Sequence, residues 1–118
     1  MELIEFLKRL NTSPDSISFA ETMAVIETMY DFTPTTFKNA SLINEAGSNN
    51  GSCKIFTFAR LHNLTQPQTL HCFGDYYRKD VMLNPEGTDH QNIRNFMATG
   101  WEGIKFDGNA LKLKIEFA

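Results

Sequence analysis

The chain has 118 residues, 42% of them hydrophobic, and a formal net charge of −3 at pH 7. This length corresponds to one domain, residues 1–118, whose core is large enough to need neither a disulfide framework nor a metal. The acidity and the scattered basic residues exclude a general nucleic-acid binder, and no apolar run reaches the roughly 18 residues of a membrane span. Two cysteines, no zinc-type spacing and no signal peptide indicate a cytoplasmic protein without metal or cofactor.

The first third of the chain predicts two amphipathic helices. Residues 2–10 form the first, because apolar side chains recur at helical spacing on one face: Leu3, Phe6, Leu7 and Leu10. The second begins near Ser18, since Ser18 and Glu21 match a capping box, and it ends before Pro34. Residues 35–45 then favour a strand, with a weak turn signal in the middle.

The middle of the chain predicts two further helices. Residues 53–64 fit a strand by alternation, but their length and a preceding Ser52, which could serve as the N-cap, favour a helix. Thr65 and Gln68 match a second capping box. The helix that they start is expected to continue until Asn84-Pro85 stops it.

A fifth helix is predicted from a third capping box, formed by Thr88 and Gln91. Gly100 suits the left-handed residue that follows a helix. That conformation would turn Trp101 back onto the last helical turn.

The C-terminal residues carry the clearest strand signal. Apolar and polar side chains alternate over residues 104–106 and 111–117, and Asp107-Gly108-Asn109 supplies a tight turn between them. We therefore expect an antiparallel hairpin, extended by a strand near Phe37. The predicted fold is α+β, with about five helices packed on a small antiparallel sheet that includes a C-terminal β-hairpin.

The best candidate for a binding site is the polar loop at residues 44–54. A Gly-bearing loop that enters a helix presents free backbone N–H groups and the positive end of the helix dipole. The loop side chains that could contact a ligand are Asn44, Glu45, Ser48, Asn49, Ser52 and Lys54. This composition is also typical of an ordinary solvated turn. The partner that it predicts is either another protein or a small anionic ligand.

A second, catalytic hypothesis uses Cys53 as a nucleophile. A cysteine in the first turn of a helix beside Lys54 can have a lowered pKa, and a histidine would have to act as its base. His90, which follows Asp89, is the second candidate catalytic residue, although Asp89 also fits a simple capping role. The alternative function is thus a small cysteine-dependent hydrolase or transferase, and whether the protein is an enzyme stays open.

Several short segments, in this order along the chain, resemble the HopJ type III effector family. They are Asp31-Phe32-Thr33-Pro34-Thr35, Asn44-Glu45-Ala46-Gly47, Gly51-Ser52-Cys53-Lys54, Cys72-Phe73-Gly74, Tyr76-Tyr77-Arg78, residues 85–90, Gly100-Trp101-Glu102-Gly103-Ile104 and Phe106-Asp107-Gly108. Each motif is weak alone, and their common order and spacing make the resemblance specific over about residues 23–111.

The resemblance implies a virulence-associated bacterial protein that plant pathogens inject into host cells by type III secretion, and it supplies no active site. Export signals of this type tend to be Ser-rich and mobile, whereas Leu3 to Leu10 reads as an ordered helix. A housekeeping relative that is not exported is therefore the alternative. Our leading prediction is a binding or interaction module of the HopJ type that recognises its partner through the loop at residues 44–54.

Overall fold

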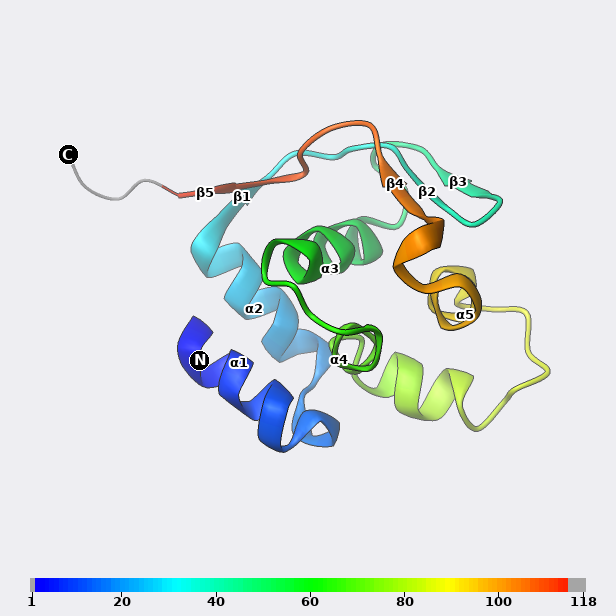
Figure 1. The fold of residues 1–118 in the computed structure, drawn as a ribbon, viewed down its shortest axis with the longest axis horizontal. Coiled ribbons are helices and arrows are strands. Elements are labelled where there is room, and N and C mark those ends of the chain that lie inside the picture. The colour runs from blue at the N-terminus through cyan, green and yellow to red at the C-terminus, as the bar shows by residue number, and fades with distance from the viewer. Residues whose placement is uncertain (1, 115–118) are drawn as a thin grey trace.

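The computed structural model describes residues 2–114, which form short helices and five three-residue strands (Figure 1). The elements are α1 (Leu3–Thr12), the 3-10 helix η1 (Pro14–Ser16), α2 (Phe19–Met29), β1 (Tyr30–Phe32), β2 (Phe37–Asn39), β3 (Leu42–Asn44), α3 (Asn50–Leu61), α4 (Gln66–His71), the π-helical η2 (Tyr76–Val81), α5 (Gln91–Thr99), the 3-10 helix η3 (Gly100–Gly103), β4 (Ile104–Phe106) and β5 (Leu111–Leu113). The α+β class is confirmed. No helix within residues 2–114 is long and apolar enough to cross a bilayer.

The strands form two small antiparallel sheets along one edge of the molecule, beside α3 (Figure 1). The predicted C-terminal strand, turn and strand are present as β4, residues 107–110 and β5. Their ladders, however, run to the N-terminal half: β4 pairs with β2, and β5 pairs with β1. The reason is that residues 33–36 run alongside the turn, where the Thr33 N–H donates to the Ala110 carbonyl and the Asp107 N–H donates to the Thr36 carbonyl. Residues 115–117 of the predicted strand lie outside the described residues.

Two of the three predicted capping boxes are confirmed. Ser18 and Glu21 cap α2, and Thr65 and Gln68 cap α4, with both reciprocal hydrogen bonds present in each box. The third prediction was wrong, because α5 begins only after His90. There the Gln91 side-chain amide donates to the Thr88 carbonyl, whereas in a capping box its oxygen would accept from the Thr88 backbone N–H.

The helix predicted from Thr65 to residue 83 is interrupted at Gly74. This glycine has φ +61°, and a Cβ atom there would lie 2.5 Å from the Phe19 backbone nitrogen. The close passage of two chain segments therefore requires a residue without a side chain, and Gly74 adopts the left-handed conformation three residues after the end of α4. The chain resumes as η2, whose i,i+5 hydrogen bonding is rare and is frequently found at functional sites.

Phenylalanine supplies the largest side chains of the core. Phe6, Phe37, Phe56, Phe58 and Phe96 are fully buried. Phe56 lies at the centre, with the rings of Phe37, Phe73, Phe96 and Trp101 between 4.9 and 6.3 Å away. Gly100 has φ +59° and Trp101 packs 5.1 Å from Phe96, which confirms the predicted return of Trp101 onto α5.

Replacing Phe56 with alanine should lower the free energy of unfolding by about 3–5 kcal/mol, because the substitution removes a fully buried ring and leaves a cavity. Urea denaturation followed by circular dichroism measures the change. Ile43→Ala, at a position that is 61% exposed, is the matched control and should stay within about 0.5 kcal/mol of the parent. A loss below 1 kcal/mol at Phe56 would contradict its central position.

Candidate functional site

Four asparagines join both ends of the β2–β3 hairpin to the starts of α3 and α5. Asn39, Asn44 and Asn92 are buried, with exposed fractions of 0%, 2% and 6%. The Asn92 side-chain oxygen accepts from the amide nitrogens of Asn39, at 3.0 Å, and Asn44, at 3.1 Å. The Asn44 oxygen in turn accepts from Asn92, at 2.9 Å, and Asn49, at 2.7 Å. This asparagine network fixes the two helix starts relative to one another.

The residue before each of these helices has a left-handed backbone. Asn49 precedes α3 with φ 55° and ψ 48°, and His90 precedes α5 with φ 49° and ψ 48°. Asparagine and histidine tolerate this conformation better than most residues do. Neither side chain caps its helix, because Asn49 donates to Asn44 and His90 contacts Asp80.

The missing caps leave backbone donors unused at both helix starts. Among the described residues, no acceptor is present for the N–H groups of Asn50, Gly51 and Ser52 in α3, or of Gln91 and Asn92 in α5. The first N–H groups of a helix carry partial positive charge and point out of the helix end. Two such ends favour an acceptor or an anion beside them.

A cavity of about 330 Å³ lies between these helix starts. Its polar walls come from Asn49, Ser52, His90, Gln91 and Asn92, and its apolar walls from Leu42, Phe73 and Ile93. We call it the α3–α5 cavity. No Asp or Glu lines it, so it contains no fixed negative charge that would repel an anion.

His90 forms the wall between this cavity and η2. Its Nε2 atom lies 3.1 Å from an Asp80 carboxylate oxygen and 3.9 Å from one of Asp89. The Tyr76 ring packs against the imidazole with centroids 5.3 Å apart. These contacts hold the His90 ring in place at the edge of the cavity, whereas Asp89 is bound mainly by Arg94, at 2.7 Å.

The structure divides the predicted binding residues into two groups. Asn49 and Ser52 line the cavity, and Asn44 lies beneath it in the asparagine network. The others lie away from it. Glu45 and Ser48 are exposed in the preceding turn, where the Ser48 N–H donates to the Glu45 carbonyl.

Lys54 also points away from the loop. Its Nζ atom lies 3.7 Å from a Glu27 carboxylate oxygen and 5.0 Å from the centre of the Phe32 ring. It therefore helps to attach α3 to α2 and β1, and the structure does not bring it to the cavity.

Cys53 lies in the interior and not in an open site. Its side chain is 1% exposed, and the thiol donates to the Thr35 carbonyl at 3.5 Å. Burial raises the pKa of the Cys53 thiol, while this hydrogen bond and the charge of Lys54 oppose the increase. No histidine within residues 2–114 hydrogen-bonds to this sulfur. This geometry does not support the cysteine-dependent hydrolase or transferase.

The sequence reasoning missed Asn39, Gln91 and Asn92. The sequence predicts a capping role for Gln91. Asn92 lies in a helix beside the apolar Ile93, and an asparagine in a helix is usually interpreted as a solvent-exposed residue. An asparagine at a position that the helical period turns inward was the one available signal.

Asn92→Ala should destabilise the fold by about 2–4 kcal/mol, because it leaves the buried amides of Asn39 and Asn44 without their common acceptor. Denaturant unfolding measures the loss. Asn11→Ala, at an exposed position on α1, should change stability by less than about 0.5 kcal/mol. Equal effects of the two substitutions would show that the network does not hold the helix starts together.

Both thiols should resist modification in the folded protein. Burial raises the pKa of Cys72 to about 12, so roughly one Cys72 thiol in ten thousand is ionised at pH 8. An aromatic disulfide reagent at pH 8 should label neither cysteine until denaturant is added. Rapid labelling of Cys53 in the native state would restore the nucleophile hypothesis.

Comparison with known proteins places the chain in a family. The family model of the HopJ type III effector protein matches residues 3–111. A solved structure titled as the crystal structure of an unknown function protein, VPA0580, is 59% identical, with a TM-score of 0.95 over 97% of this chain and 95% of that one. No protein of curated function gives a significant match. The chain belongs to the HopJ type III effector protein family.

Proposed function

We propose that this protein is a binding module that holds an anionic group of its ligand, a carboxylate or a phosphate, in the α3–α5 cavity. The observation that supports this is the meeting of two uncapped helix starts at one cavity. A group with several acceptor oxygens can satisfy N–H donors from both helices at once. The Ser52 hydroxyl, which lines the same cavity, adds a further donor.

The asparagine network favours binding over chemistry at this place. It fixes the two helix ends from below, so the donors keep their positions before a ligand arrives. Binding to such a preorganised site loses little free energy to ordering of the chain. By contrast, no hydrogen bond joins Ser52 to His90 within residues 2–114, so a serine nucleophile with a histidine base is not assembled.

Membership of the HopJ family supports delivery of such proteins by type III secretion. We place the function of the module in the host cell after export, with the bacterial cytoplasm as the site of synthesis. The housekeeping alternative differs only in location, because the same cavity would serve either role.

Inorganic phosphate is the simplest probe of the site. In an amide-resolved NMR titration, phosphate should shift the N–H signals of Asn50, Gly51, Ser52, Gln91 and Asn92 in a saturable manner. Ser52→Asp should weaken this binding at least about tenfold, equivalent to ~1.4 kcal/mol, because the new carboxylate occupies the cavity and competes for the donors. An acidic residue in the first helical turn is stabilising, so the variant should fold.

Ser48→Asp is the matched control, since it adds the same charge in the exposed part of the loop. It should leave phosphate affinity within about twofold of that of the parent, because water and salt screen a charge in an exposed position. Equal binding by the two variants, or shifts scattered away from both helix starts, would refute the proposed function.

A further inference from the structure

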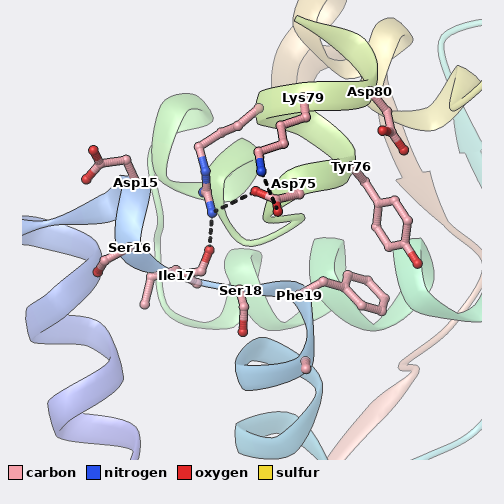
Figure 2. Close-up of a pocket in the computed structure, with 11 residues that line it drawn as sticks. Asp15, Ser16, Ile17, Ser18, Phe19, Asp75, Tyr76, Lys79 and Asp80 are labelled. Carbon is pink, nitrogen blue, oxygen red and sulfur yellow. Dashed lines mark hydrogen bonds and ion pairs between the residues drawn. The ribbon is translucent and has the colours of Figure 1, made fainter. Parts of the chain in front are cut away.

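A groove of about 760 Å³ lies between the start of α2 and η2. Figure 2 shows Asp15 and Ser16 at one end, and the rings of Phe19 and Tyr76 at the other, with Lys79 reaching toward Asp75 between them. We call it the η2 groove. It is larger than the α3–α5 cavity and differs from it in chemistry.

The groove and the cavity share a wall. Tyr76 lines the groove, and its ring packs 5.3 Å from His90, which lines the cavity. Asp80 lines the groove and contacts the same histidine at 3.1 Å. The two hollows are therefore neighbours across the thickness of one or two side chains.

An aromatic pair covers the end of the groove that is next to the cavity. Phe19 and Tyr76 meet edge to face, with ring centroids 5.0 Å apart. The Phe19 ring also lies against Gly51 at the start of α3, where a Cβ atom would come within 3.0 Å of it. Tyr76 remains 44% exposed. An exposed aromatic ring that is held by neighbours provides contact area at low entropic cost, as in binding surfaces generally.

The groove, unlike the cavity, is lined by carboxylates. Asp15, Asp75 and Asp80 line it, against Arg78 and Lys79. The Arg78 guanidinium donates to the backbone carbonyls of Pro14, Ile17 and His71, so it serves mainly to hold the groove together. Lys79 pairs with Asp75 at 3.6 Å, and Arg78 lies 3.9 Å from the same carboxylate. The carboxylates therefore exceed the cations, and the groove favours a positively charged group.

We propose that the two hollows together bind one extended segment of a partner protein. Its acidic or phosphorylated side chain occupies the α3–α5 cavity, an apolar side chain lies on the Phe19–Tyr76 pair, and a basic side chain lies in the η2 groove. The inference rests on the proposed function for its first contact and adds the class of partner. A polypeptide supplies an anionic, an apolar and a cationic group within a few residues, which is the order that the surface requires.

Short blocked peptides test this proposal with the whole protein. Each carries one Glu, one Phe and one Lys in that order, separated by Gly-Ser spacers of varied length. A second set has phosphoserine in place of Glu, and control sets replace Glu or Lys with Gln. Amide-resolved NMR titrations, with inorganic phosphate alone as reference, locate each contact. At least one peptide should shift the amide signals of both hollows: Ser52, Gln91 and Asn92 for the cavity, and Phe19, Tyr76 and Asp80 for the groove. Phosphate alone should shift only the amide signals of the cavity.

Two substitutions separate the groove from the cavity. Tyr76→Ala should weaken peptide binding at least tenfold and phosphate binding far less, because it removes the apolar contact of the peptide but only one of the contacts that hold His90. Met82→Ala, which is also exposed and close to η2, should change neither. Asp15→Lys should weaken the peptide that contains Lys but leave the Lys→Gln control peptide unchanged. The comparison of Glu with phosphoserine distinguishes a carboxylate from a phosphorylated ligand.

The outcomes are distinct. If phosphate shifts no amide signals at the two helix starts, the proposed function itself is refuted. Phosphate binding that persists while no peptide shifts the groove, or equal effects of Tyr76→Ala and Met82→Ala, refutes only the peptide inference and indicates a small anionic ligand.

Discussion

The amide pair between Asn44 and Asn92 is the contact on which the rest of the functional region depends. Each side chain both donates to and accepts from the other, and Asn39 and Asn49 complete their remaining bonds. The network spans elements that are about 50 residues apart in sequence, so one cluster fixes β2, β3, α3 and α5 at a single point. Its geometry leaves the Asn39 oxygen without a partner, which costs free energy. The network therefore fixes the positions of these elements at some cost in the free energy of unfolding.

The diversion of Asn49 into this network explains the cavity above it. An asparagine before a helix ordinarily accepts from the second or third helical N–H with its side-chain oxygen. Here its amide nitrogen is used by Asn44, and its left-handed backbone turns the chain into α3 without a cap. His90 plays the equivalent part before α5, where contacts with Asp80 and Tyr76 engage its ring. Uncapped helix ends on opposite walls are the direct result.

Local signals made the helices predictable, whereas contacts distant in sequence decided the site. The capping boxes at Ser18 and Thr65 were confirmed because both partners lie three residues apart and need no other element. The box at Thr88 failed because α5 begins at Gln91, after His90, and Arg94 binds Asp89 in the segment before it. The partners of β4 and β5 and the convergence of Ser52 with His90 depend on how distant segments pack, which periodicity does not reveal.

The donors at the starts of α3 and α5 belong to the backbone, and this affects how relatives can diverge. Side-chain substitution cannot delete a backbone N–H unless it introduces proline, so the anion-binding capacity that we propose would be inherited with the fold. Mutation can readily alter the η2 groove, where Tyr76 and Asp15 are exposed. On the proposed binding mode, relatives that keep the asparagine network would exchange partners through a few surface changes, while the contact with the anionic group would stay the same.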